Sequence, residues 1–226
     1  MAGKKLIALG DLHGILPELD WSADYLLIAG DIVPLNVQSS SQGTKKWIRD
    51  TFNPWCSKFE GKVIIVAGNH DIAFERHGHE YTFSSNVIYL ENEFWSDDTI
   101  QVYGTPLCKI FGNWAFMRPQ MEQKEIFDKF QGFEEDDRIK IVLSHDAPYG
   151  TSDVILDKTC AWYTPDHLGN KALTDLITRV EPDINIHGHL HSTSHNYEFM
   201  GKTASVCVSY VGEDYKPTYS PYTLEV

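Results

Sequence analysis

Short apolar runs recur along the chain, and many of them end in a polar residue or a polar pair. Continuous runs of Val, Ile and Leu are typical of strands that are buried on both faces. The sequence therefore predicts strands at residues 6–9, 25–29, 63–67, 139–143 and 184–186. Two segments near the C-terminus, residues 205–211 and 222–226, alternate partially and are further strand candidates.

Apolar residues at helical spacing lie between these runs. They predict helices at residues 45–52, 119–130 and 168–180. The Asn53-Pro54 step is expected to end or kink the first helix, and Met121 and Phe127 are expected on the core-facing side of the second. Alternation of buried strands with helices predicts an α/β protein, and late strands without an intervening helix indicate a mixed sheet or a second sheet.

The composition is that of an ordinary globular protein. The chain has 226 residues, of which 42% are hydrophobic and 23% charged, and this length favours a single domain over residues 1–226. With 32 acidic and 19 basic residues the net charge is −13. Long nucleic acids and anionic membranes are therefore not expected as partners, because both require clustered Lys and Arg. No obligate protein partner is evident.

The N-terminus does not resemble an export signal. The apolar run after Lys5 stops at Gly10, whereas a signal peptide needs about 7–15 apolar residues and a spanning helix about 20. The cysteines, none of them in a CxxC pair, are Cys56, Cys108, Cys160 and Cys207. This spacing favours reduced, partly buried thiols and a cytoplasmic location.

Oxygen and imidazole donors follow the predicted strands. They are Asp11, His13, Asp31, Asn69, His70, His145, His189 and His191. Such a set, which contains no thiolate, is expected for borderline or hard divalent metals. In an extended segment Asp11 and His13 would share one face and reach one ion, and His189 and His191 repeat that spacing. Asp31 has two carboxylate oxygens and can bridge two cations.

Each piece taken alone has a simpler interpretation. A Gly-Asp pair such as 30–31 is usually a turn, and an Asn-His-Asp triplet such as 69–71 is usually a cap or a turn. A Ser-His pair such as 144–145 is more often structural than catalytic. Three histidines within residues 187–191 are harder to explain by packing, and Gly188 among them lets the backbone turn sharply or approach closely. The combination, at successive strand ends, favours a metal site.

The order of these motifs resembles the calcineurin-like metallophosphoesterase superfamily. Its signature reads D-x-H, GD, GNH[ED], a single His after a strand, and GHxH. The matching segments are Asp11-Leu12-His13, Gly30-Asp31, Gly68-Asn69-His70-Asp71, His145 and Gly188-His189-Leu190-His191. Loop motifs at 102–106, 111–116 and 144–150 resemble the metallophosphoesterase-domain-containing proteins, which lie near the class III cyclic nucleotide phosphodiesterases.

The resemblance implies a four-layer αββα sandwich of two mixed sheets flanked by helices. It also implies two divalent metal ions, for which Mn, Fe, Zn, Ni and Co all suit the donors. The first ion would be held by Asp11, His13 and His191, the second by Asn69, His145 and His189, and Asp31 would bridge both. A hydroxide shared by the ions would attack the phosphorus of a small phosphodiester. Asn69 and His70 would contact the substrate, and His70 would protonate the leaving group.

One departure from the family pattern narrows the range of substrates that we expect. Protein phosphatases of the superfamily carry GDxVDRG, and this chain lacks that Arg after residues 30–31. Hydrolysis of phosphoproteins is therefore disfavoured relative to cyclic-nucleotide-like diesters. A phosphomonoesterase or a nucleotide pyrophosphatase on the same site stays open as an alternative, and a non-catalytic metal-binding scaffold is a weaker one.

Five residues near the motifs have roles that the sequence leaves open. His187 is expected to be packed and His195 to lie on the surface. Asp146 is expected to cap a loop, with support of a metal ligand as the alternative. Trp114 and Phe116 could flank a nucleobase, but core positions are favoured for both.

Overall fold

The computed structural model describes residues 3–226. One sheet consists of β1 (Lys5–Leu9), β2 (Tyr25–Ala29), β3 (Lys62–Val66), β4 (Val87–Tyr89) and β11 (Tyr222–Glu225). The other consists of β5 (Glu93–Ser96), β6 (Ile100–Thr105), β7 (Ile139–Ser144), β8 (Ile184–His187), β9 (Glu198–Met200) and β10 (Thr203–Cys207). The helical elements are α1 (Ser41–Trp47), the π-helical turn η1 (Ile48–Phe52), α2 (Asn53–Cys56), α3 (Phe74–His77), the 3₁₀ turn η2 (Gly78–Glu80), α4 (Gln120–Phe127) and α5 (Lys171–Val180).

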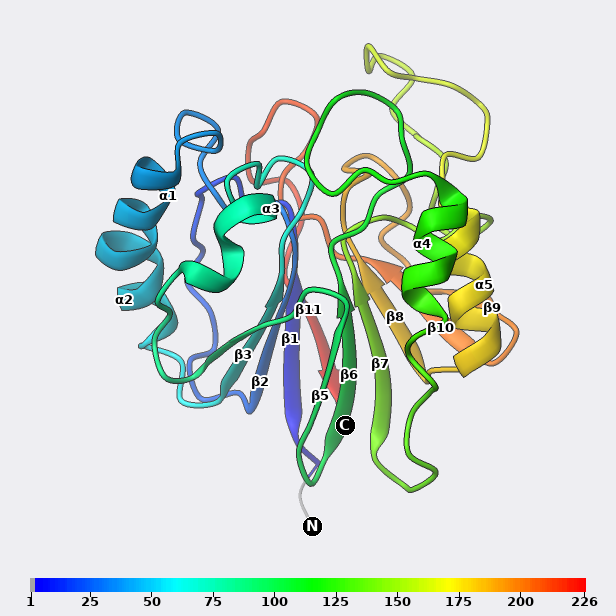
Figure 1. Ribbon diagram of the computed structural model, residues 1–226, viewed down its shortest axis with the longest axis horizontal. Helices are drawn as coiled ribbons and strands as arrows, with labels where there is room; N and C mark the ends of the chain where they lie inside the picture. Colours follow the sequence, from blue (N-terminus) through cyan, green and yellow to red (C-terminus); the bar gives the residue numbers. More distant parts are fainter. Residues whose placement is uncertain (1–2) are drawn as a thin grey trace.

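The two sheets pack face to face, with helices on their outer sides (Figure 1). The strand order is β11-β1-β2-β3-β4 in the first sheet and β5-β6-β7-β8-β10-β9 in the second. Strands β11, β5 and β9 pair antiparallel with their neighbours, and the other pairs are parallel. Both sheets are therefore mixed, and the predicted αββα sandwich is confirmed.

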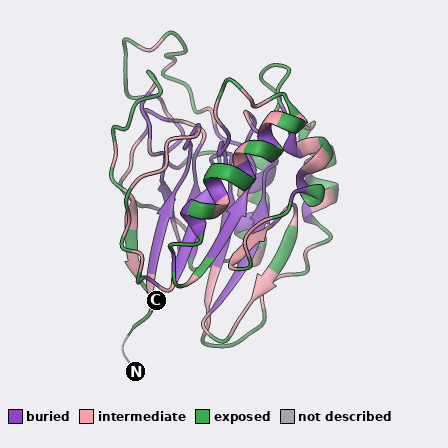
Figure 2. Cartoon of the chain, turned by 90° about the vertical axis from the view of Figure 1, so that its left-hand side faces the viewer, coloured by how far each residue is buried: buried purple, intermediate pink, exposed green. Residues whose placement is uncertain are grey.

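Successive side chains of the central strands point to opposite faces of the sheet, so each strand packs against the other sheet on one face and against helices on the other. Leu27 of β2 lies in the core between the sheets, in one cluster with Ile141 of β7. Its neighbour Ile28 faces the other way and packs in a cluster with Phe52 and Trp55 of the helical run. The central strands are buried along their length while the helices expose their outer faces (Figure 2). Continuous apolar runs result because both faces of these strands are covered.

Most predicted strands are present with small differences at their ends. Strand β2 has the predicted bounds, and β1, β3, β7, β8 and β11 match their predictions to within one residue at either end. The strand predicted at 205–211 is wrong beyond Cys207, because the chain leaves the sheet there. Strands β4, β5, β6 and β9 were not predicted, and β5 and β9 are partly exposed edge strands without a continuous apolar run.

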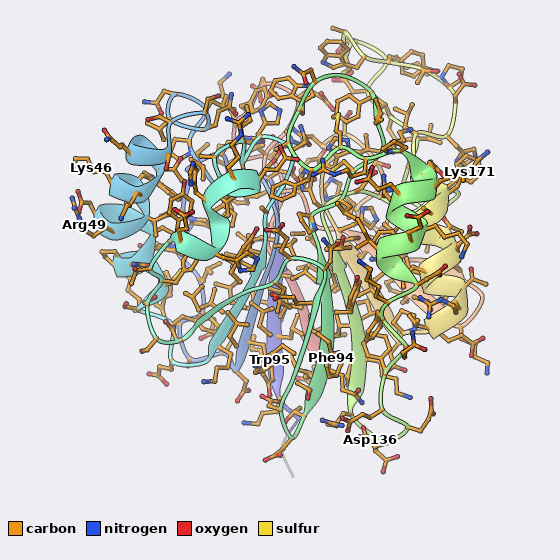
Figure 3. The ribbon with its side chains drawn as sticks, in the orientation of Figure 1. Lys46, Arg49, Phe94, Trp95, Asp136 and Lys171 are labelled. Atoms are coloured by element: carbon orange, nitrogen blue, oxygen red, sulfur yellow. The ribbon has the colours of Figure 1, made fainter. Side chains whose placement is uncertain are left out.

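The helices differ more from expectation. Helix α5 starts later than predicted because the Asn170 side chain caps it, accepting hydrogen bonds from backbone N–H groups. The prediction for the Asn53-Pro54 step was that the helix ends or kinks there, and the helix does not end, because the helical run extends through α2 after the π-helical turn η1. Pro54 lies in the first turn of α2, where a missing N–H costs little. Met121 is 80% exposed, contrary to expectation, and Lys46 and Arg49 project away from the sheets (Figure 3).

The cysteines are unpaired, as expected. Cys56, Cys108 and Cys207 are buried, and Cys160 is half-buried. Among the helices in residues 3–226, none has the length and apolar character needed to cross a bilayer.

Candidate metal centre

The proposed site lies where the carboxyl ends of parallel strands from both sheets meet, at the upper edge of the sheets in Figure 1. Parallel strands of a sheet end at the same edge, so residues that follow them can converge although they are far apart in sequence. The chain leaves β1 at Asp11, β2 at Asp31, β3 at Asn69, β7 at His145, and β8 at His189 and His191.

One group of converging side chains consists of Asp11, His13 and His191, here called the Asp11 cluster. Their potential ligand atoms lie within 4.8 Å of one another, and all three side chains are buried. His191 Nε2 is 3.4 Å from Asp11 Oδ1. The Ser209 hydroxyl donates to Asp11 Oδ2 at 2.5 Å, and the backbone N–H of His189 donates to both carboxylate oxygens. The Asp11 carboxylate is thus held in one orientation.

A second group consists of Asn69, Cys108, His145 and His189, here called the His145 cluster. The ligand atoms of its cysteine and two histidines again lie within 4.8 Å of one another. Asn69 Oδ1 is 2.9 Å from His145 Nε2. His145 Nδ1 donates to the backbone oxygen of Ala29 at 2.8 Å, which directs Nε2 into the centre.

Asp31 lies between the two clusters. Its Oδ2 is 3.8 Å from His13 Nε2, and its Oδ1 is 3.5 Å from His145 Nε2. The backbone N–H of His70 donates to Oδ1 at 2.7 Å. The two oxygens of one carboxylate therefore face different clusters, which is the placement that bridging of two cations requires.

The ligand-bearing turns use left-handed backbone. Asp11, His13, Asp31 and His189 have φ values of 52°, 43°, 51° and 73°. The expectation of an extended segment from Asp11 to His13 is therefore wrong, although both side chains reach the same cluster. A non-glycine residue with left-handed backbone lowers the stability of the fold by about 1–3 kcal/mol, and such residues concentrate at functional sites. The strained turns direct the side-chain donors toward the centre of the site.

Two glycines allow the turns to approach the carboxylates. A Cβ atom at Gly68 would lie 2.3 Å from Asp31 Oδ1, and one at Gly188 would lie 2.4 Å from Asp11 Oδ2. Any side chain at either position would displace a carboxylate. The expected close approach at Gly188 is confirmed.

Asp71 joins two of the ligand-bearing turns. Its fully buried carboxylate accepts hydrogen bonds from the backbone N–H groups of Ile32, Val33 and Gly68. The turn after β2 is thereby tied to the turn after β3. The last residue of the GNH[ED] motif thus orients the backbone that carries Asp31.

Buried negative charge is concentrated at the centre. Burial raises the pKa of Asp31 to about 7, opposed by His145 and aided by Asp71. Burial acts to lower the pKa of His191, but Asp11 outweighs it and raises that pKa to about 9. The protonated imidazole of His191 thus supplies positive charge beside the Asp11 carboxylate, and a bound divalent cation would also supply positive charge there.

His13 gives a direct test of whether metal ions fit. Its side chain is buried, yet neither ring nitrogen has a hydrogen-bond partner within residues 3–226. An unpaired buried polar atom costs about 1–3 kcal/mol, and ligation of an ion removes that cost. The surrounding donors are carboxylate, amide, imidazole and thiol groups, which suit first-row divalent ions. The residues present therefore fit divalent metal.

His70 lies beside the Asp11 cluster and outside both groups of ligand atoms. Its ring centroid is 5.1 Å from that of His13, and its Nδ1 is 3.0 Å from Gln38 Oε1. Burial, followed by the charge of His145, lowers the pKa of His70 to about 4.

Three partly exposed aromatic side chains surround the histidines, and together they are called the aromatic rim. The ring centroid distances are 4.4 Å for Trp114 and His70, 5.1 Å for Phe111 and His189, and 4.8 Å for Tyr215 and His13. The expectation of a core position is correct for Phe116, which is 2% exposed, and wrong for Trp114, which is 37% exposed.

The other residues whose roles the sequence left open are His187, His195 and Asp146. His187 is fully buried in β8, as expected. His195 is half-buried, and its Nε2 donates to the backbone oxygen of His191 at 3.0 Å, so the expected surface position is wrong. Asp146 caps backbone N–H groups, including that of Lys109 at 2.9 Å, as expected for a loop cap.

Sequence reasoning missed four residues that contact this centre: Gln38, Cys108, Ser209 and Tyr215. Cys108 follows β6, and its position after a strand would have marked it had β6 been recognised. Ser209 was included in a strand that ends earlier, at Cys207. Gln38 lies in a loop and carries no pattern that points to the site.

The chain belongs to the calcineurin-like phosphoesterase family, whose profile matches residues 4–193. Metallophosphoesterase domain-containing protein 1 of Homo sapiens and that of Mus musculus are each 23% identical to the chain, over 98% of this chain and 71% of theirs. These relatives agree with the branch indicated by the loop motifs. Family and fold together identify a metal-dependent hydrolase of phosphoric esters.

Solved structures share the fold at low identity. One superposes with a TM-score of 0.65 at 18% identity and covers 90% of both chains. The phosphopantetheinyl hydrolase of Mycobacterium tuberculosis superposes with a TM-score of 0.52 at 16% identity, covering 95% of this chain and 92% of its own. At these identities the likeness concerns the fold alone.

Proposed function

We propose that the protein hydrolyses small phosphodiesters of the cyclic-nucleotide type and holds two divalent cations to do so. The observation that carries this proposal is the position of Asp31, whose oxygens face the Asp11 cluster on one side and the His145 cluster on the other. Cations held there would supply positive charge to the phosphoryl oxygens and lower the pKa of the attacking water.

His70 is the residue proposed to handle the leaving group. Because its Nδ1–H donates to Gln38 Oε1, Nε2 is the ring nitrogen left for the substrate. The protonated ring donates from Nε2 to the departing oxygen, a contribution of about 10²–10⁴ in rate. The negative charge of a bound phosphate opposes the burial that lowers the pKa of His70. Asn69, whose Oδ1 faces His145, is proposed to contact a phosphoryl oxygen through Nδ2.

Two features support a diester with a flat organic group. The aromatic rim borders the histidines, and stacking of a nucleobase on such rings contributes about 0.5–1.5 kcal/mol. Leu35 stands where the resembling protein phosphatases have Arg, so no guanidinium is present there to grip a monoester dianion. The net charge of −13 also disfavours long nucleic acids as substrates.

A cytoplasmic location of the protein stays a prediction from the sequence.

The test compares substrates on one preparation. Metal-stripped protein is reloaded with each candidate metal, and kcat/KM is measured for bis(p-nitrophenyl) phosphate, cyclic nucleotides, p-nitrophenyl phosphate, a phosphopeptide and a dinucleoside polyphosphate. We expect the two kinds of diester to be preferred. A preference for p-nitrophenyl phosphate or the phosphopeptide would overturn the proposal, and a preference for the polyphosphate would favour the pyrophosphatase.

The aromatic rim is tested with two diesters that share a leaving group. Trp114→Ala is expected to lower kcat/KM for thymidine 5′-p-nitrophenyl phosphate by about 2–10-fold, the equivalent of one lost aromatic contact. Methyl p-nitrophenyl phosphate should be unaffected. The matched control is Trp162→Ala, which removes a tryptophan that is 77% exposed and outside the rim. Equal losses on both diesters would remove the nucleobase from the proposal.

A further inference from the structure

The thiol of Cys108 lies among the imidazoles of the His145 cluster, and no motif of the family includes it. Its Sγ is within 4.8 Å of ligand atoms of His145 and His189. Zinc bonds of about 2.0 Å to nitrogen and 2.3 Å to sulfur allow two ligands of one ion to be at most about 4.3 Å apart. The 4.8 Å limit within which these three ligand atoms lie is close to that range.

The backbone around Cys108 is held on both sides. Its N–H donates to the backbone oxygen of Phe116 at 3.0 Å, and its carbonyl accepts from Gln123 Nε2 at 2.9 Å. The next N–H, of Lys109, donates to the buried carboxylate of Asp146 at 2.9 Å. The loop that carries Cys108 is therefore held in place, and Asp146, the residue after His145, connects this loop to the turn that carries His145.

The sulfur itself is weakly engaged. Its contact with the backbone oxygen of Pro106 is 3.5 Å long. The other fully buried cysteines have different surroundings, since Cys56 packs in the apolar cluster under the helices and Cys207 contacts the Ser209 hydroxyl. Within residues 3–226, Cys108 is the cysteine that shares a group of potential ligands with two histidines.

We propose that Cys108 is a thiolate ligand of the ion held by the His145 cluster. When the ion binds, the S–H bond breaks, the proton leaves to solvent, and a sulfur lone pair forms the bond to the ion. This inference rests on the proposed function only in requiring an ion at this position.

Ligation by sulfur makes the two positions of the centre selective for different metals. A thiolate with two imidazoles favours Zn²⁺, Co²⁺ or Fe²⁺ over Mn²⁺ and Mg²⁺. The Asp11 cluster contains only oxygen and nitrogen donors and has no such preference. The centre is therefore expected to be chemically asymmetric.

Spectroscopy on metal-loaded protein tests the ligand directly. X-ray absorption of the protein carrying two Zn²⁺ ions should contain a sulfur shell at about 2.3 Å, with about half a sulfur per zinc. The Co²⁺-loaded protein should show thiolate-to-cobalt charge transfer in the near ultraviolet. Cys108→Ser should abolish both signals, whereas Cys56→Ser, a matched change of another fully buried cysteine, should retain them.

Metal titration supplies a second measurement. Cys108→Ser should weaken one of two Zn²⁺ binding events by at least about tenfold and leave the other unchanged. A zinc shell of nitrogen and oxygen alone in the unaltered protein would overturn the inference, even with phosphodiester hydrolysis intact. A sulfur shell in protein that hydrolyses no diester would support ligation and contradict the proposed function. Binding of no ion would overturn both.

Discussion

The two halves of the metal centre are built from different donors and are held by different parts of the chain. The Asp11 cluster joins a carboxylate to two imidazoles, and its carboxylate is oriented by Ser209 from the segment after β10. The His145 cluster joins an amide, two imidazoles and a thiol, and its central imidazole is oriented by the backbone oxygen of Ala29.

The two clusters therefore differ in the kind of donor that sets them apart: a charged carboxylate oxygen in the Asp11 cluster and a polarisable thiol sulfur in the His145 cluster. The Asp11 cluster contains a carboxylate, whereas the only acidic group of the His145 cluster is its thiol. Asp31 is the group that both halves share. A change at Asp31 should therefore affect both halves, whereas a change to a side chain that contacts only one cluster should affect only that half.

The largest effect is expected from Asp31→Ala. Removing the shared carboxylate should lower occupancy of both ions and reduce turnover by about 10³-fold or more, since charge stabilisation by metal is worth several kcal/mol. Elemental analysis of the folded variant gives the metal content, and the exposed Asp98→Ala is the control. Two ions still bound to folded Asp31→Ala protein would show that the halves are independent.

A smaller effect is expected from His70→Ala, which should leave both halves filled. Because His70 lies outside the ligand groups, metal content should remain near normal while kcat falls by about 10²-fold. Metal analysis and kinetics on the same sample make the measurement. Loss of an ion together with activity would instead make His70 a ligand.

The smallest effect is expected from Ser209→Ala, which should act on one half. Loss of the 2.5 Å hydrogen bond to Asp11 Oδ2 should weaken the ion at the Asp11 cluster by about tenfold and spare the other. Titration with a competing chelator resolves the two affinities. Ser205→Ala is the matched control, since Ser205 is buried in β10 and donates to Asn185. Equal weakening of both ions would remove the distinction between the halves.

Much of the fold follows from local patterns. The apolar runs of β1, β2, β3, β7 and β8 predicted buried strands because each of those strands is covered on both faces. Strand β6, which is buried throughout, was not recognised because Gln101, Tyr103 and Gly104 interrupt its apolar pattern. Its absence from the prediction also concealed the position of Cys108 at the end of a strand.

The sequence by itself determined which donors stand at the strand ends and, through their order, the family to which they belong. The tertiary structure decided which donors share a cluster, because parallel strands from two sheets bring together residues as distant as Asp11 and Ser209. It also decided the left-handed turns at Asp11 and Asp31 and the place of Trp114 at the rim. These features depend on contacts between the sheets and their loops, and a local pattern carries no information about contacts made so far along the chain.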